Sequence, residues 1–160
     1  MKRISVLLSF VAIVMLLSFQ ESSSQVRWMV GGRLGMSIVS AGGETEAGLQ
    51  IGPMLEVIFN RHMALTEAFN INTQPGTPIE WSNYFKYYFS RGRIEPYLDG
   101  GFSFWFVGGG PYFGIPFGGG LLFEISRNLY IPMDFQFGPV FFTGNNIFMV
   151  EVTSGIRYEF

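Results

Sequence analysis

The residues of this chain that could do chemistry are charged side chains, which stand at alternate positions within apolar or glycine-rich stretches. The set is Arg33, Glu56, Glu80, Lys86, Asp99, Glu124, Asp134, Glu151 and Arg157. Cations and carboxylates that are buried together form ion pairs, and they could also line a narrow path for ions or small solutes. Carboxylates outnumber cations here. Some of them must therefore be protonated, reach water at the ends of the protein, or meet a cation.

Residues for other kinds of chemistry are scarce. The chain has no cysteine and one histidine, His62, so disulfides and thiolate metal sites are excluded, and we expect no metal and no cofactor. Residues 108–110 are consecutive glycines, but they follow one expected strand and precede another, whereas a phosphate-binding loop precedes a helix. A net charge of -2 argues against nucleic acid as a partner.

The charged residues belong to segments in which polar or small residues alternate with large apolar ones. This period of two indicates β-strands with two different faces. Eight such strands are expected, at residues 28–40, 49–59, 63–72, 79–89, 95–107, 112–125, 129–141 and 147–160. Their lengths suit the roughly 9–11 residues of a tilted transmembrane strand, and an even number closes into an antiparallel barrel.

Two kinds of barrel would alternate in this way. A soluble up-and-down barrel such as a lipocalin places its apolar face inside, whereas a membrane barrel places it outside. Aromatic residues make up 18% of the chain and charged residues 14%. The polar face is too sparsely charged for a soluble exterior, and its glycines and serines suit the inside of a narrow barrel. We therefore expect an all-β, eight-stranded, antiparallel up-and-down transmembrane β-barrel.

Three residues interrupt the apolar face. Pro53 cannot donate a backbone hydrogen bond, and it weakens the strand prediction where it stands. Glu67 and Asn83 are polar residues at apolar positions. For Glu67, either a β-bulge shifts the alternation locally or the strand protrudes beyond the bilayer at that point.

The first residues indicate export. Lys2 and Arg3 precede an apolar run at residues 4–19, and serines follow at 22–24. This pattern predicts a Sec-type signal peptide at residues 1–24, which leaves a single barrel domain at residues 25–160. A retained membrane anchor is the alternative, but the apolar run falls short of the roughly 20 residues that span a bilayer. Without a cysteine after the leader, the chain is not expected to be a lipoprotein.

The last strand carries a recognisable ending. Phe160 is preceded at alternate positions by Tyr158 and Ile156. In this ending and its strand pattern, the chain resembles small bacterial outer-membrane β-barrel proteins of the OmpA/OmpX-like, porin-family type, without the soluble module that follows the barrel in OmpA-type proteins. The resemblance implies residence in the outer membrane of a Gram-negative bacterium, among outer-membrane lipid and lipopolysaccharide. It also implies that Ile156, Tyr158 and Phe160 are the signal read by the barrel-assembly machinery. Deletion of Phe160 should then impair membrane insertion.

With the leader removed, both termini are expected in the periplasm, together with the turns at residues 61, 91–93 and 127. The loops at residues 41–48, 73–78, 108–111 and 143–146 would face outward, and all four are short. Arg157 and Glu151 are expected near Arg33, because the last strand must pair with the first.

An eight-stranded barrel is just wide enough for side chains to fill it, so the interior charges are best interpreted as a plug. We therefore expect a structural or protein-interaction role, for example as an accessory subunit of another outer-membrane protein. A narrow ion or solute channel is the alternative. A lipid-modifying enzyme is less well supported, because His62 would lie in a periplasmic turn, and we predict that the chain is not an enzyme.

Overall fold

The computed structural model describes residues 26–108, 110–142 and 145–160, and the predicted signal peptide lies outside them. Extended backbone dominates because β-branched and aromatic residues alternate with small or polar ones over long stretches. The strands are β1 Arg27–Ala41, β2 Glu44–Ile58, β3 Met63–Asn72, β4 Ile79–Tyr88, β5 Ile94–Val107, β6 Gly110–Gly114, β7 Phe117–Ser126, β8 Leu129–Phe142 and β9 Asn145–Glu159. Within the described residues, no helix is long and apolar enough to span a membrane.

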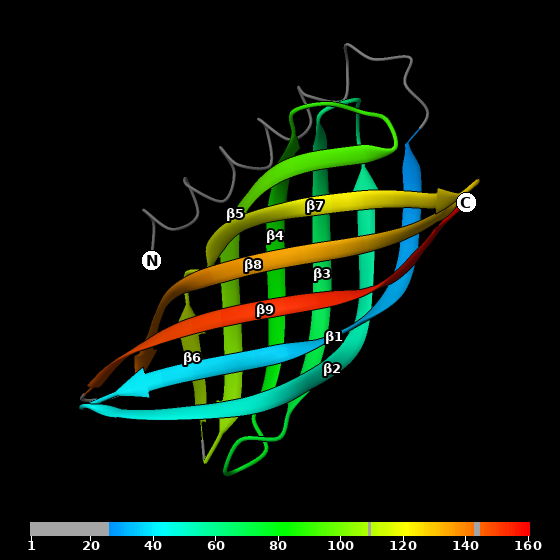
Figure 1. The fold of residues 1–160 in the computed structure, drawn as a ribbon. Helices are drawn as coiled ribbons and strands as arrows, with labels where there is room; N and C mark the ends of the chain where they lie inside the picture. The colour runs from blue at the N-terminus through cyan, green and yellow to red at the C-terminus, as the bar shows by residue number, and fades with distance from the viewer. Residues whose placement is uncertain (1–25, 109, 143–144) are drawn as a thin grey trace, which may run out of the picture.

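The strands form one closed antiparallel ring. Consecutive strands pair, except that β6 and β7 each pair with β5 and β8 and not with each other, and β1 also pairs with β9, which closes the sheet (Figure 1). The backbone N–H of Phe160 donates to the carbonyl oxygen of Trp28 at 3.0 Å, so the start of β1 and the last residue lie at one end of the barrel. We call this the terminal end and the opposite one the far end. The predicted all-β barrel is confirmed.

One predicted strand, at residues 112–125, is divided into β6 and β7. Proline at position 116 has no N–H to donate, and the regular ladder lapses at Ile115–Pro116. The register continues across the gap, since β5 pairs Ser103 with Gly114 before it and Gly100 with Phe117 after it. β6 and β7 therefore occupy one position in the ring, and the barrel keeps the predicted eight-strand plan.

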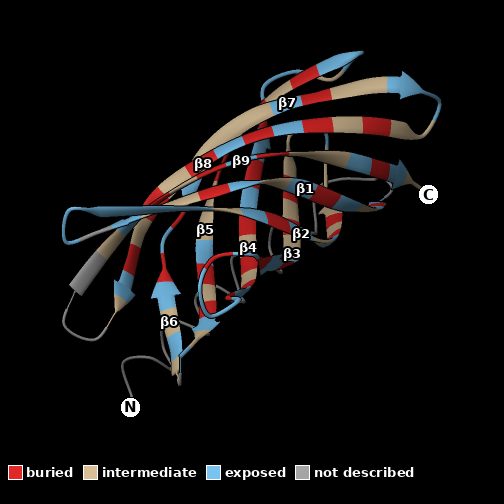
Figure 2. Ribbon diagram, turned by 60° about the horizontal axis from the view of Figure 1, so that its bottom comes forward, coloured by how far each residue is buried: buried red, intermediate tan, exposed pale blue. Residues whose placement is uncertain are grey.

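Burial alternates along most of the strands, as the banding in Figure 2 shows, most regularly in β3, β4 and β8. Ile51 and Ile156 expose 59% and 58% of their surfaces on the outer wall, whereas Arg33 and Arg157 expose 3% and 0% inside. Apolar side chains thus dominate the outer wall, and the charged ones, apart from Glu67, face inward. This arrangement excludes the soluble-barrel alternative, because an exposed apolar wall around a charged interior suits hydrocarbon rather than water.

The prediction of a loop at residues 41–48 is wrong. β1 and β2 continue through this polar sequence and are joined by a tight turn in which Ala41 pairs with Glu44. Gly42 and Gly43 have φ values of 57° and 93°, in the left-handed region that such a turn requires. The apolar alternation ends before the hydrogen-bonded strands do, because residues beyond the bilayer need no apolar face.

The register around Glu67 shows no bulge. β2 pairs Ile51 with Ile71 and Met54 with Ala68 in one constant register. Gly52 and Pro53, which lie between them, have no ladder partner in β3, and proline has no backbone N–H to donate to a ladder. Glu67 lies in the middle of β3 rather than at a protruding end, so both explanations expected for it are wrong. It points outward from the wall.

Candidate functional site in the barrel interior

The charged side chains meet in two layers inside the barrel. The first lies nearer the terminal end, and we call it the Arg157 layer. Arg157 on β9 places Nη1 2.8 Å from Glu56 Oε2 and Nη2 3.5 Å from Asp134 Oδ2. Lys86 Nζ lies 3.4 Å from Asp134 Oδ1, 3.6 Å from Glu56 Oε2 and 3.9 Å from Asp99 Oδ2. Two cations and three carboxylates from five strands are thereby joined across the barrel.

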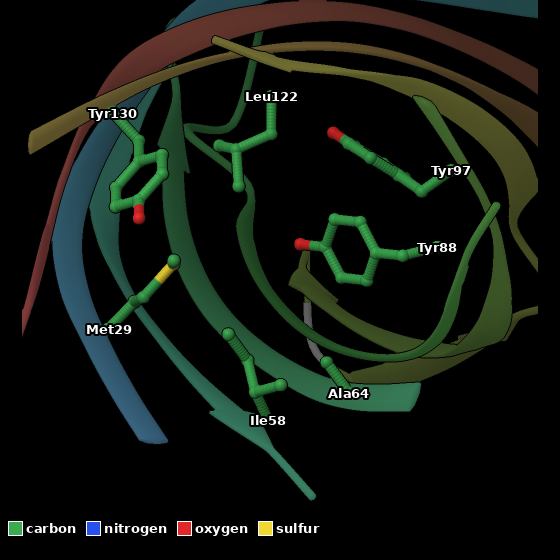
Figure 3. Packing of buried hydrophobic residues seen from close by; sticks show 7 residues of the cluster. All are labelled: Met29, Ile58, Ala64, Tyr88, Tyr97, Leu122 and Tyr130. Atoms are coloured by element: carbon green, nitrogen blue, oxygen red, sulfur yellow. The ribbon is translucent and has the colours of Figure 1, made fainter. Parts of the chain in front are cut away.

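Hydroxyl groups complete the Arg157 layer. Tyr88 and Thr66 both donate to Glu56, the latter at 2.8 Å, and Tyr97 donates to Asp134. Tyr88 and Tyr97 come from the ends of β4 and β5 that lie near the terminal end, and their phenol groups point inward (Figure 3). Each of the two central carboxylates therefore accepts hydrogen bonds from neutral donors as well as from cations, which is how a buried charge is tolerated.

The second layer lies nearer the far end, and we call it the Arg33 layer. Arg33 Nη2 is 3.5 Å from Glu80 Oε2 and 3.4 Å from Glu151 Oε2, while Arg33 Nε donates to Asn70 Oδ1 at 2.7 Å. Asn70 Nδ2 in turn donates to Glu80 at 2.7 Å, and Ser82 also donates to Glu80. One guanidinium group here serves two carboxylates.

Apolar side chains close the interior at both ends. At the terminal end, a buried cluster of side chains points into the interior from the wall and consists of Met29, Ile58, Ala64, Tyr88, Tyr97, Leu122 and Tyr130 (Figure 3). At the far end, Trp105, Val140 and Met149 are buried together, with Tyr112 and Phe142 stacked at a centroid distance of 3.7 Å against them. The charged layers are thus enclosed between two apolar layers.

A small apolar cavity of about 170 Å³ lies at the far end of the barrel. Its lining includes Trp105, Val140 and Phe142, the side chains that close the interior there, and Gln74 from the β3–β4 loop. Gln74 Nε2 donates to the carbonyl oxygen of Ser37 at 3.1 Å, which fixes the loop across the barrel mouth. No residue of the Arg33 layer lines the cavity.

The structure brings together all of the predicted interior residues except Glu124, which is half-buried near the terminal end of β7, opposite Tyr130. The expected neighbourhood of Glu151 and Arg33 is present, whereas Arg157 pairs with Glu56 and Asp134 instead. The hydrogen-bond donors of the network were not singled out from the sequence. All of these donors occupy inward-facing positions of their strands, so the alternation along each strand was the signal that could have identified them. The donors are Thr66, Asn70, Ser82, Tyr88, Tyr97, Gln136 and Thr153.

The residues predicted as an assembly signal all lie on the outer wall. Ile156, Tyr158 and Phe160 expose 58%, 46% and 74% of their surfaces. A side chain displayed in this way is accessible to another protein, and the assembly role stays a prediction. His62 lies in the β2–β3 turn at the terminal end, where its Nδ1 is 2.8 Å from the carbonyl oxygen of Tyr88.

A closed ring with an apolar outer wall and a charged, filled interior defines a small membrane-spanning β-barrel. Solved structures agree. Neisserial surface protein A matches with a TM-score of 0.67 and 14% identity over 83% of this chain and 97% of that one. The N-terminal barrel of Pseudomonas aeruginosa OprF matches with a TM-score of 0.61 and 12% identity over 85% and 100%. Ail of Yersinia pestis gives 0.58 and 12% over 86% and 100%.

No family model matches the chain, and no curated protein is detectably similar in sequence. The likeness is therefore one of fold. Together with the apolar wall it confirms the predicted fold, a small antiparallel membrane-spanning β-barrel. The OmpA/OmpX-like family and the location in the outer membrane stay predictions.

Proposed function

We propose that this protein is a non-conducting outer-membrane barrel with a structural or protein-interaction role, acting as an accessory subunit through its outer wall. The observation that carries the proposal is the filling of the interior. Two apolar layers enclose the ion-paired layers, and Arg157 and Lys86 expose 0% and 1% of their surfaces. A path for ions would have to cross both apolar layers and separate buried ion pairs, each of which is costly.

The far end supports a role for the wall rather than for loops. The β1–β2 connection is a tight turn, and the β3–β4 loop folds across the mouth through Gln74. These two described connections leave little loop surface for a partner outside the cell, and small barrels that bind external partners commonly use long loops. The wall, in contact with outer-membrane lipid and lipopolysaccharide, is the larger surface available to another membrane protein.

The channel alternative and the proposed role give opposite results in planar bilayers. The refolded protein, shown to be inserted by heat-modifiable gel migration, should give no unitary conductance steps. Steps that persist, and whose ion selectivity changes when Lys86 is replaced by glutamine, would replace the proposal with conduction through the interior. Steps that are insensitive to Lys86→Gln would be leakage around the barrel and would leave the proposal intact.

The interaction role is tested by extraction from native outer membranes in a mild detergent. The proposed role requires the barrel to migrate in a complex larger than its monomer. A monomer under all mild conditions, together with an unchanged envelope when the protein is deleted, would count against it. Unchanged lipid A mass spectra on overexpression would separately remove the lipid-modifying alternative, which the position of His62 does not favour.

A further inference from the structure

Glu67 carries a carboxylate on the outer side of the barrel wall, where the other side chains are apolar or uncharged. It is half-buried on the outer face of β3, and on the outward faces of the described strands no other side chain carries a charge. Hydrocarbon cannot solvate a charge, so ionisable residues in membrane segments almost always face the protein interior. A carboxylate that faces outward therefore indicates a surface that something other than lipid covers.

The depth of Glu67 excludes the lipid head groups as its partner. On the β3–β4 hairpin, Glu67 pairs directly with Asn83. Two apolar outward rows lie on each side of this pair: Met63 with Tyr87 and Leu65 with Phe85 toward the terminal end, and Phe69 with Trp81 and Ile71 with Ile79 toward the far end. The polar pair is thus the middle row of the hairpin, where lipid offers no hydrogen-bonding group.

The contacts around Glu67 leave one carboxylate oxygen and one amide nitrogen without a hydrogen-bond partner among the described residues. Trp81 Nε1 donates to Oε1 of Glu67 at 2.8 Å. Beside it, the Nδ2 of Asn83 is buried and forms no hydrogen bond within the described part of the chain. Asn83 must therefore rotate its amide for Nδ2 to reach a partner on the outer face. After that rotation, the second carboxylate oxygen and the amide lie next to each other on adjacent strands as one acceptor and one donor.

We infer that this face of the barrel docks a second copy of the same chain, so that the protein works as a symmetric dimer. A two-fold axis along the membrane normal, running between β3 and β4, would set Asn83 of each copy opposite Glu67 of the other at nearly the same depth. An isologous interface requires such self-complementarity, because each group meets its partner's counterpart. The amide then donates to the carboxylate twice, and both polar groups leave the lipid.

The shape of the wall fits the same symmetry. An apolar hollow lies mainly over β1, β2 and β3 and reaches Ile79 of β4; its lining includes Gly32, Pro53 and Phe69. On the other side of β4, β5 carries bulky outward side chains, including Phe102, which is directly opposite Asn83 in the register. The two-fold axis sets β5 of one copy over the hollow of the other. The protruding aromatic side chains of β5 therefore pack against the hollow of the other copy, and the symmetry repeats this contact.

The absence of cysteine from the whole sequence makes the dimer directly testable. Leu65→Cys places a single thiol one outward row from Glu67, and Val152→Cys places one on the outward face of β9, on a different part of the wall. In outer membranes treated with a mild oxidant, Leu65→Cys should form a disulfide-linked homodimer at least ten times faster than Val152→Cys. Equal rates, or no dimer from Leu65→Cys, would overturn the inference.

Two substitutions then test the polar pair itself. Glu67→Leu and Asn83→Leu, each made in the Leu65→Cys background, should reduce cross-linking at least tenfold. Ser154→Ala is the matched control, because Ser154 is an outward polar residue on β9 that already donates to the carbonyl oxygen of Pro132 at 2.8 Å, and it should leave cross-linking unchanged. Heat-modifiable migration shows that each variant is folded. Folded leucine variants that cross-link as fast as the parent would count against the pairing.

The dimer rests on the proposed interaction role and names its partner, but the two can fail separately. If Leu65→Cys links to a different membrane protein, the second copy is wrong and the interaction role stands. If the dimer forms and the planar bilayers show selective conductance, the dimer stands and the non-conducting role fails.

Discussion

The Arg157 layer and the Arg33 layer both contain buried charges, but different numbers of cations and hydrogen-bond donors stabilise them. Each buries charge in a barrel too narrow for bulk water. In the Arg157 layer, two cations face three carboxylates, and hydroxyl donors support Glu56 and Asp134. In the Arg33 layer, one cation faces two carboxylates, and Glu151 has a single charged partner at 3.4 Å. Both layers carry an excess of carboxylate, but the second supports it with fewer donors.

This difference indicates that the two layers contribute unequally to stability. A buried ion pair adds stability only when its remaining lone pairs are satisfied, and removing one partner leaves an uncompensated charge. The Arg157 layer meets that condition more fully, so it should hold the barrel together. The Arg33 layer should tolerate change, particularly at Glu151. The following substitutions test this comparison in order of expected effect.

Arg157→Met should be the most destabilising substitution in the interior. It removes the guanidinium that bridges Glu56 and Asp134 and leaves both carboxylates buried with fewer partners. The loss should be roughly 3–5 kcal/mol of unfolding free energy, the usual result of breaking a buried ion pair. Urea unfolding in detergent micelles measures it. A loss below that of Arg33→Met would reverse the proposed ranking of the layers.

Arg33→Met should cost less, about 1–3 kcal/mol, the range for leaving a buried polar partner unsatisfied. Both Glu80 and Glu151 lose their ion pair with Arg33, but Glu80 keeps its hydrogen bonds from Asn70 and Ser82. The same urea titration applies. The informative quantity is the difference from Arg157→Met, since both variants replace a buried arginine by a side chain of similar length.

Tyr88→Phe should cost about 1–2 kcal/mol, because it deletes one hydroxyl donor to Glu56 and keeps the ring in the apolar layer at the terminal end. Tyr87 on the same strand provides the control. It points outward with 42% of its surface exposed, and Tyr87→Phe should change stability by no more than about 0.5 kcal/mol. Equal effects of the two substitutions would show that the phenol of Tyr88 does not support the carboxylate.

The barrel could be predicted from the sequence because a membrane-spanning strand places a physical requirement on each of its residues. Every second side chain must suit hydrocarbon and the others must fit a narrow interior, so parity alone identifies which face holds Arg33 or Glu80. Strand boundaries were less predictable where that requirement lapses. β1 and β2 extend past the apolar alternation to Ala41 and Glu44, and Pro116 interrupts a strand whose register does not change.

The partners within the interior were less accessible from sequence. Parity says that Arg157 and Glu56 both point inward, but they are 101 positions apart and their strands are not neighbours in the ring. Which inward residues share a depth depends on strand tilt and stagger, which are properties of the closed barrel as a whole. Only pairs on adjacent strands, such as Glu151 near Arg33, could be anticipated. Glu67 was recognisable from the sequence as an exception, but neither explanation expected for it is correct.

Glu151→Gln should have the smallest effect of the interior substitutions and could raise stability slightly, within about 1 kcal/mol of the parent. It keeps the size of the side chain and its acceptor oxygen, while removing one of the two like charges that converge on Arg33 Nη2. Asp134→Asn is the matched change in the other layer. There the carboxylate contacts Lys86 and Arg157, so the same neutralisation should be clearly destabilising. Equal losses for the two variants would mean that the excess charge is balanced alike in both layers, and the comparison would fail.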